Sequence, residues 1–292
     1  MSVEGASAPA VVLGAPGTWT ETFDVEVSAS QAIAYAKATN ESDRRFLSGA
    51  MASPMFATVP VRPATRAAFA LAMPEGLPPT VPRLAGEQDM HFQAAIVPGR
   101  PVRCRARFLG ISPKSSGTAL AFEVETQDGD GALLNRQYMT TFLPRVRWPR
   151  EEGERPPDRA IPPAVGARPV LAQITQRLDR DQTFRYAEAA GDPSRWHLDD
   201  AVARAAGLPG IIIHGLCTMA FLGRALAECV ADGDVLRVKR LAVRFSRPIF
   251  PGSAMTTDIR AGDARGGRRV YVFEATRADG ERVITNGMAE VD

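Results

Sequence analysis

The sequence has few cysteines and lacks long apolar runs, and each shortage excludes a class of protein. Its three cysteines, Cys104, Cys217 and Cys229, are widely spaced, odd in number and without a CxxC pair. This pattern excludes a disulfide framework or a thiolate metal cage, so we expect no metal and a reducing, cytoplasmic location. The most apolar patch is only Ile211 to Ile213. It is far shorter than the roughly 18 apolar residues of a membrane-spanning helix, and we expect no membrane partner.

The sequence also lacks an excess of charge of either sign. Its 35 basic and 33 acidic side chains leave a formal net charge of +2. This balance gives no sign of binding to nucleic acid or to a membrane surface, so an anionic ligand must be met by local basic side chains. With 292 residues, of which 45% are hydrophobic and 23% charged, the chain is expected to be globular, and two domains are favoured.

Prolines concentrate between residues 144 and 168, where they are interleaved with charged residues. Proline removes a backbone donor and fixes φ, so this Pro-rich segment is predicted to be an extended linker that enters neither a sheet interior nor a helix. It separates an N-terminal domain, 21–143, from a C-terminal domain, 169–292. Residues 1–20 have neither a basic region nor a sustained apolar stretch, so they are predicted to be a flexible N-terminal tail.

The two halves resemble each other at matching positions. Tyr35 to Thr39 is echoed by Tyr186 to Ala190, and Val97 to Gly99 by Phe250 to Gly252, at offsets of 151 and 153 residues. Because the offset hardly changes along the half, a duplication is predicted.

Each half is predicted to contain strands around one main helix. In the second half, a short helix that Asp179 or Asp181 can cap is expected to end at Gly191, and a longer apolar helix spans about 214–230. The first-half counterpart of the longer helix, 63–70, is predicted to have only about two turns. The expected strands are 22–27, 89–96, 101–112, 119–127 and 133–143, then 169–174, 237–245, 253–261, 269–276 and 281–291.

Histidine is scarce as well, because His91, His197 and His214 are the only three in the chain. Two of them lie in one region, which contains GDPSRWH at 191–197 and PGIIIHG at 209–215. A carboxylate and an imidazole five residues apart, across a helix-to-loop turn, can converge on one water molecule. One accepts the hydrogen bonds of the water and the other takes its proton, which is general acid–base chemistry.

These motifs resemble the signature of the MaoC-like dehydratase and R-specific enoyl-CoA hydratase (hydratase 2) family, Gly-Asp-x-Asn-Pro-hydrophobic-His followed by Gly-x-x-x-His-Gly. Ser194 and Arg195 stand where the family usually has Asn and Pro. The first half is similar to the family's N-terminal hotdog through Gly86 to Asp89 and Pro98-Gly99. The resemblance implies an α+β double hotdog fold, with two antiparallel sheets each wrapped on a helix that could join as one continuous long sheet.

By this resemblance Asp192 and His197 are the catalytic dyad, and the backbone N–H of Gly215 polarises a thioester carbonyl. The implied reaction is reversible hydration of a trans-2-enoyl-CoA to a (3R)-3-hydroxyacyl-CoA by a hydro-lyase, with no cofactor beyond the coenzyme A of the substrate. Water addition at C3 places enolate charge on the thioester oxygen, which an N–H at the start of an apolar helix is suited to stabilise. Ser194 and Trp196 are expected to position the substrate, although Trp196 could equally be a core residue.

Several other polar residues have two interpretations. His214 is expected to make a structural hydrogen bond to the backbone rather than to act as a second acid, and His91 to be an ordinary strand residue. A basic stretch at 237–247 is either solvated charge at an edge or a site for the phosphates of coenzyme A. The candidates for the phosphate site are Lys239, Arg240, Arg244 and Arg247.

The first half lacks the dyad. Aligning the two halves on their Tyr-Ala segments places Glu41 near the position of Asp192 and Phe46 near that of His197. We therefore expect one active site per chain, with the N-terminal hotdog as a scaffold. Its short helix leaves part of a sheet face uncovered, where the acyl chain of the substrate could be housed.

Two other functions remain open. The dyad could work in the direction of dehydration on an acyl-carrier-protein or specialised-pathway thioester, which makes a carrier protein an alternative partner to acyl-CoA. From another class, a non-catalytic acyl-thioester-binding hotdog protein fits the altered residues Ser194 and Arg195. A homodimer is also open.

Overall fold

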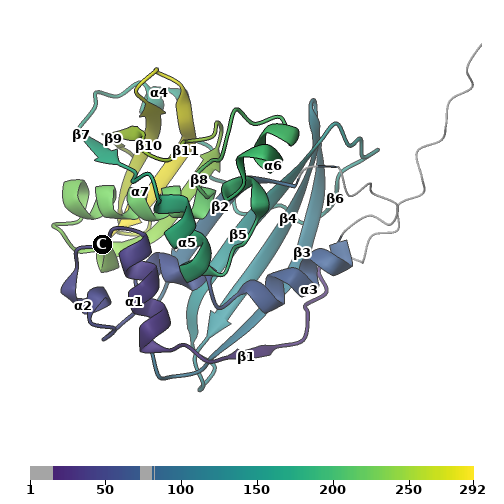
Figure 1. Ribbon diagram of the computed structural model, residues 1–292, viewed down its shortest axis with the longest axis horizontal. Helices are drawn as coiled ribbons and strands as arrows, with labels where there is room; N and C mark the ends of the chain where they lie inside the picture. Colours follow the sequence, from purple (N-terminus) through teal and green to yellow (C-terminus); the bar gives the residue numbers. More distant parts are fainter. Residues whose placement is uncertain (1–15, 73–80, 82) are drawn as a thin grey trace, which may run out of the picture.

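The computed structural model describes residues 16–72, 81 and 83–292, and these form one 11-stranded antiparallel sheet with helices against one face (Figure 1). The strands of the first half are β1 (Phe23–Val25), β2 (Leu84–Phe92), β3 (Val102–Lys114), β4 (Gly117–Gln127), β5 (Leu133–Pro144) and β6 (Glu152–Gly153). Those of the second half are β7 (Ala172–Arg177), β8 (Val238–Phe245), β9 (Ala254–Ala261), β10 (Arg269–Arg277) and β11 (Arg282–Val291). The strand order is β1-β3-β4-β5-β2-β8-β11-β10-β9-β7, with β6 paired to β3.

The two halves meet at the centre of the sheet, where β2 pairs with β8. Met90 lies opposite Leu241 in this ladder, and Asp89 lies opposite Ala242. The ladder joins two half-sheets into one continuous sheet, which was one of the expected arrangements, and the α+β class is confirmed. Across the junction the guanidinium of Arg240 donates to the Asp89 carboxylate at 2.9 and 2.6 Å, and both side chains are buried.

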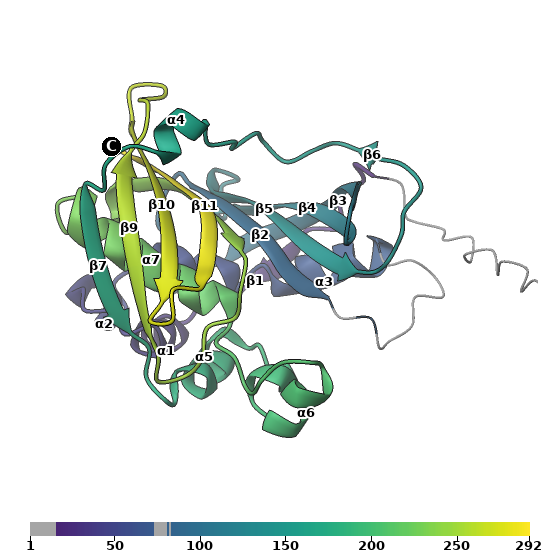
Figure 2. The same ribbon diagram turned by 90° about the horizontal axis from the view of Figure 1, so that it is seen from above.

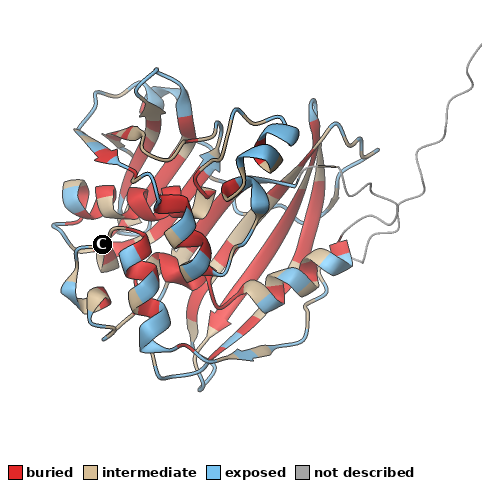
Figure 3. Cartoon of the chain, viewed as in Figure 1, coloured by how far each residue is buried: buried red, intermediate tan, exposed pale blue. Residues whose placement is uncertain are grey.

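Helices α1, α5 and α6 lie on one side of the sheet, and Figure 2 shows α4 and the segment that leads to it from β6 on the other side. The α-helices are α1 (Ala29–Ala38), α2 (Arg44–Leu47), α3 (Arg62–Ala72), α4 (Pro163–Gly166), α5 (Gln182–Ala190), α6 (Asp200–Ala205) and α7 (Gly215–Val230). The 3-10 helices are η1 (Pro54–Thr58), η2 (Arg195–His197) and η3 (Val235–Arg237). Apolar side chains such as Phe221 and Leu222 of α7 are buried between the helices and the sheet, where Figure 3 shows the core.

The two halves repeat each other in backbone detail. The N–H of Glu41 donates to the Ala36 carbonyl just after α1, and the N–H of Asp192 donates to the Ala187 carbonyl just after α5, each at 2.9 Å. The helices α1 and α5 pack against each other. The duplication that the sequence predicts is therefore visible in the fold.

The structure corrects several predicted boundaries. β2 runs from Leu84 to Phe92 rather than over 89–96, and α3 has 11 residues rather than about two turns. α3 is still shorter than α7, which has 16 residues, as expected. These differences arise because pairing with neighbouring strands and packing on the sheet, not the local pattern, decide where an element ends.

The Pro-rich segment was predicted to be extended, and this was only partly right. Its residues Glu152 and Gly153 form β6 on the edge of β3, and residues from Pro163 form the one-turn helix α4. Proline is tolerated at the first helical position because the N–H that it lacks would have no partner there.

The predicted N-terminal tail is shorter than expected. The N–H groups of Gly17 and Thr20 donate to the carbonyls of Phe108 and Ala106 on β3, both at 2.8 Å. Residues 16–20 are thus attached to the sheet, while 1–15 lie outside the described residues.

Candidate functional site

The candidate dyad lies on a loop that α5 and η2 position. α5 ends at Gly191, whose φ of 64° lies in the left-handed region that favours glycine. The N–H of the next residue, Asp192, donates a hydrogen bond to the Ala187 carbonyl within α5. The 3-10 helix η2 then places the His197 ring near the Asp192 carboxylate, whose negative charge acts to raise the pKa of His197.

The tautomer of His197 follows from one hydrogen bond. Its Nδ1 lies 2.8 Å from the carbonyl oxygen of Ile212, and because a carbonyl can only accept, Nδ1 carries the proton and Nε2 is the basic nitrogen. The ring is 9% exposed, and burial lowers the pKa of His197 below its usual 6.5, outweighing the Ile212 bond and the Asp192 charge. The imidazole is therefore neutral near pH 7, as a general base must be.

Asp192 is held as a carboxylate by groups from three parts of the chain. The Ser194 hydroxyl donates to Oδ1 at 2.6 Å, and the Arg62 Nη1, at the start of α3 in the N-terminal half, lies 3.9 Å from Oδ2. Burial tends to raise the pKa of Asp192, but the Ser194 bond, the Arg62 charge and the nearby His214 and His197 rings, which are charged only at acid pH, lower it below its ordinary value. Ser194, predicted to position the substrate, thus contacts Asp192 itself.

His214 stacks on His197, with ring centroids 3.7 Å apart and planes at 22°. Its Nε2 lies 3.2 Å from the backbone carbonyl of Asp192, so Nε2 donates the expected structural hydrogen bond to the backbone. Burial, together with the neighbouring His197, lowers the pKa of His214 to about 4. A neutral His214 therefore supports the loop that carries Asp192 and the ring of His197.

Thr183 of α5 is a residue of the site that the sequence motifs did not indicate. Its fully buried hydroxyl lies 3.1 Å from the His197 carbonyl, 3.3 Å from the Ile212 carbonyl and 3.1 Å from Nδ1 of His214. These contacts join the dyad loop to the segment before α7. A threonine on the buried face of a predicted helix was the available signal, because a buried hydroxyl needs partners.

Gly215 is the first residue of α7, so its N–H is one of the four that a helix leaves without an intrahelical partner. The residue is half-buried and its backbone packs against the ring of Phe245. A Cβ added at Gly215 would lie 3.1 Å from the Phe245 ring, closer than packed carbon atoms usually lie. Glycine therefore keeps a polar N–H close to the site, at the positive end of a 16-residue helix.

Trp196 lies beside the dyad rather than in the core. Its side chain is 36% exposed, and its ring meets the His197 ring edge-on, with centroids 6.0 Å apart. The core interpretation of Trp196 is wrong, and the position next to His197 is compatible with a pocket wall. Arg195, in the same loop, is exposed and pairs with Asp199 at 2.7 Å.

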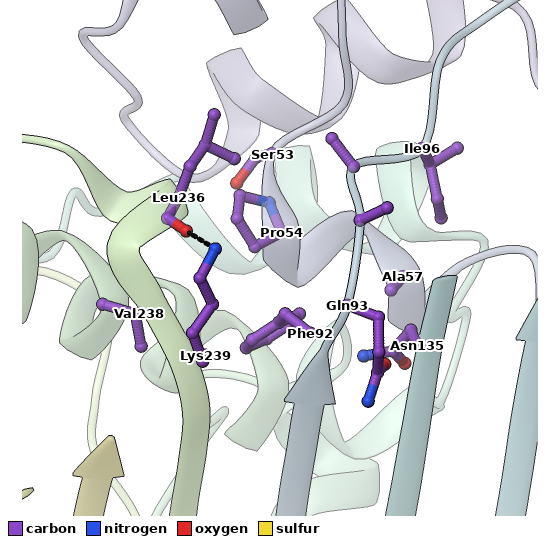
Figure 4. Close-up of a pocket in the computed structure, with 12 residues that line it drawn as sticks. Ser53, Pro54, Ala57, Phe92, Gln93, Ile96, Asn135, Leu236, Val238 and Lys239 are labelled. Carbon is purple, nitrogen blue, oxygen red and sulfur yellow. Dashed lines mark hydrogen bonds between the residues drawn. The ribbon is translucent and has the colours of Figure 1, made fainter. Parts of the chain in front are cut away.

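The four candidates for phosphate binding do not meet at the dyad. Arg244 pairs with Glu87 at 2.7 Å and Arg247 with Glu281 at 3.5 Å, both on the exposed surface. Lys239 lines a separate cavity beside η3 (Figure 4). A phosphate role for these three stays a prediction.

Arg240 is corrected to a structural residue. Its guanidinium is 6% exposed and is shared between the carboxylates of Asp89 and Glu290. A side chain already neutralised inside the sheet is not available to a phosphate. His91, an ordinary strand residue as expected, lies next to this cluster with its Nε2 3.3 Å from Asp89.

Within the described ranges, no group of three or more His, Cys, Asp or Glu side chains is arranged to hold a metal ion. No helix in that part of the chain is long and apolar enough to cross a membrane.

Comparison with known proteins relates the second half to one family. A family model described as "MaoC like domain" matches residues 163–281. The peroxisomal multifunctional enzyme type 2 of Mus musculus is 26% identical over 208 residues, 71% of this chain and 27% of that protein. A peroxisomal enoyl-CoA hydratase 2 of Arabidopsis thaliana is 28% identical over 183 residues, 58% of this chain and 59% of that protein. The chain thus spans less than two thirds of the length of these curated relatives. Both relatives are named peroxisomal, so the cytoplasmic location stays a prediction.

Solved structures are similar over nearly the whole chain. A MaoC-like dehydratase from Phytophthora capsici aligns with 93% of this chain and 95% of that chain at a TM-score of 0.77 and 23% identity. A Mycobacterium tuberculosis protein described as having a double hotdog fold aligns with 92% of this chain at a TM-score of 0.58 and 13% identity. Likeness at these identities shows the fold, and the expected double hotdog is confirmed.

Proposed function

Since the chain carries a MaoC like domain over residues 163–281, on a double hotdog fold, we propose that it is a hydro-lyase acting on acyl thioesters. The reaction is reversible addition of water to a trans-2-enoyl-CoA. The product is a 3-hydroxyacyl-CoA, and the (3R) configuration is the one that the family resemblance implies. Named enoyl-CoA hydratases among the relatives support this class of substrate.

The observation that carries the proposal is the arrangement of three polar groups from neighbouring elements. His197 presents a neutral ring with a basic Nε2, Asp192 presents a carboxylate, and Gly215 presents an N–H at a helix start. In hydration, Asp192 accepts a hydrogen bond from the water and Nε2 of His197 takes its proton while the water oxygen bonds to C3. The electron pair of the double bond moves onto the thioester oxygen, which the Gly215 N–H stabilises. Return of the proton to C2 completes the product.

The N-terminal half contributes to this site through Arg62. Its guanidinium stands next to the Asp192 carboxylate and is half-buried, so it favours the ionised form and restrains its orientation. Because Arg62 acts through Asp192, we assign it as a positioning residue. The site is then composite, with a dyad from one repeat and a cation from the other.

The same half is proposed to house the acyl chain. Phe69 of α3 and Met139 of β5 are apolar side chains that the core leaves partly buried, and the rings of Phe69 and Phe122 are 4.3 Å apart. An acyl chain laid along such side chains would remove their remaining apolar surface from water.

Replacing the dyad tests the function directly. Asp192→Asn and His197→Gln should each lower the turnover of crotonyl-CoA or a longer enoyl-CoA by about a hundredfold or more, since each disturbs proton transfer. The rate is followed by the loss of ultraviolet absorbance of the conjugated double bond. Arg195→Gln, on the exposed side of the same loop, is the matched control and should keep wild-type turnover.

Circular dichroism and thermal melting of all three variants separate loss of chemistry from loss of fold. Near-normal turnover in both dyad variants would refute the mechanism. A wild-type protein that binds enoyl-CoA without converting it would instead favour the non-catalytic binding protein.

A further inference from the structure

The two stacked histidines of the candidate site are held in opposite tautomers. His197 donates through Nδ1 to the Ile212 carbonyl, which leaves its Nε2 as the basic nitrogen. His214 donates through Nε2 to the Asp192 carbonyl, which leaves its Nδ1 without a proton in the neutral ring. His214 is only 2% exposed, so this bare Nδ1 needs a hydrogen-bond donor from the protein.

Thr183 of α5 is the residue that can supply this donor. Among the described residues its hydroxyl is the only hydrogen-bond partner of the His214 Nδ1, at 3.1 Å, and Thr183 is fully buried. The Thr183 Oγ1 also lies 3.1 Å from the His197 carbonyl and 3.3 Å from the Ile212 carbonyl. A hydroxyl has a single proton, so three acceptors compete for it.

The direction of the hydroxyl proton follows from the other bonds of these acceptors. The Ile212 carbonyl already accepts from Nδ1 of His197. Of the two acceptors that remain, the imidazole nitrogen of His214 is far more basic than the amide carbonyl of His197. A hydroxyl turned to the His197 carbonyl would set the lone pairs of Oγ1 and Nδ1 against each other, or force the proton of His214 away from the Asp192 carbonyl. The hydroxyl therefore donates to Nδ1 of His214.

We propose that Thr183 is a positioning residue of the hydration reaction, which rests on the function proposed above because His197 is the base of that reaction. By donating to Nδ1, the hydroxyl fixes the ring of His214 in the tautomer that carries its proton on Nε2. That ring acts on both members of the dyad. Its Nε2–H holds the backbone of Asp192, and its face supports the ring of His197 at 3.7 Å. One buried hydroxyl on α5 thus orients the base and the carboxylate together.

Removal of the Thr183 hydroxyl tests the proposal by kinetics. Thr183→Val keeps the shape of the side chain and should lower kcat for enoyl-CoA hydration by about tenfold with little change in KM, because the dyad loses its alignment. Thr183→Ser keeps the hydroxyl, so its kcat should be close to that of the wild type. Thr257→Val is the matched control. Thr257 of β9 is also fully buried, but its hydroxyl has no hydrogen-bond partner among the described residues, so its loss should leave kcat unchanged.

The tautomers themselves are measured by ¹H–¹⁵N NMR correlation of the imidazole rings, in which the three histidines of the chain give few signals to assign. At pH 7 in the wild type and in Thr183→Ser, His197 should be protonated at Nδ1 and His214 at Nε2. In Thr183→Val the ¹⁵N resonance of the His214 Nδ1 should move downfield, toward that of an imidazole nitrogen that accepts no hydrogen bond. If Thr183→Val does not fold, the wild-type spectrum still decides which nitrogen of His214 carries the proton.

A wild-type His214 protonated at Nδ1 would overturn the proposal, and so would an Nδ1 resonance that stays in place in Thr183→Val. A kcat of Thr183→Val equal to that of the Thr257→Val control, a change in KM alone, or an equal loss in Thr183→Ser would overturn it too. The NMR measurement needs no turnover, so it tests the hydrogen bond even if the protein binds enoyl-CoA without converting it. The two proposals therefore fail separately.

Discussion

Asp192 shows how a single side chain is prepared by residues that are distant in sequence. Its carboxylate receives a hydrogen bond from Ser194 in its own loop and the charge of Arg62 from the other half of the chain. Its backbone carbonyl accepts from His214, which also supports the ring of His197. Ser194, which departs from the family signature, is therefore a hydrogen-bond donor to the carboxylate of the candidate dyad.

Replacing Arg62 isolates its contribution. Arg62→Gln should lower kcat by about tenfold with little change in KM, because a partly exposed charge at 3.9 Å is worth on the order of 1 kcal/mol. Arg62→Lys keeps the positive charge, so its kcat should be close to that of the wild type. High salt should narrow the difference between wild type and Arg62→Gln, since salt screens such a pair. A KM effect without a kcat effect, or no rescue by lysine, would contradict a role through Asp192.

At the scale of single residues, the sequence predicts the residues of the motif. It does not predict the residues that hold the motif in place. Asp192, His197 and Gly215 stand at fixed spacings in two short motifs, so they can be identified from the sequence. Arg62 and Thr183 carry no local signature, because their partners are defined only when the halves and the helices pack. Arg240 was misassigned for the same reason, since its carboxylate partners come from other strands.

At the scale of elements, the C-terminal end of α5 sets the direction in which the loop of Asp192 and His197 leaves the helix. Gly191 ends the helix with a φ of 64°, and Asn40 occupies the equivalent point after α1 with a φ of 54°. The repeat thus contains both residue types that tolerate the left-handed region.

Substitution of Gly191 tests this comparison. Gly191→Ala should lower the free energy of unfolding by about 1–2 kcal/mol through backbone strain alone, because the nearest atom to an added Cβ, on Arg62, is at an ordinary 3.8 Å. Gly191→Asn should cost clearly less, as Asn40 indicates. Urea denaturation of both variants measures the difference, and equal losses in the two would argue against a conformational cause.

Elements were predictable where local pattern and packing agree. The apolar helix at 214–230 and the strands of the second half lie within a few residues of their predicted bounds. β2 was shifted because its early residues pair with β5 and β8, which no local alternation reveals. The Pro-rich segment could not be predicted to form β6, since that pairing depends on an edge that β3 provides.

At the scale of the whole molecule, the contacts that join the halves include the β2–β8 ladder and a buried ion pair within it. Arg240 and Asp89 are 151 residues apart in sequence and meet at the β2–β8 junction with exposed fractions of 6% and 3%. The pKa of Asp89 is lowered: burial alone would raise it, but hydrogen bonds and charges from His91 and Arg240 outweigh burial. Such a pair needs both partners, because removal of one leaves a buried charge uncompensated.

A double-mutant cycle tests whether this pair couples the halves. Arg240→Met should lower the free energy of unfolding by about 3–5 kcal/mol at pH 7. Asp89→Asn should destabilise the wild type, yet stabilise the Arg240→Met variant because it removes the stranded carboxylate. Without Arg240, burial of Asp89 is opposed only by His91, so the pKa of Asp89 rises from its lowered value. The deficit of Arg240→Met should therefore shrink as the pH falls and Asp89 takes up a proton. Urea denaturation from pH 7 to pH 5 measures both effects. Additive single losses, or a deficit that grows toward low pH, would show that the β2–β8 ladder joins the halves without help from the ion pair.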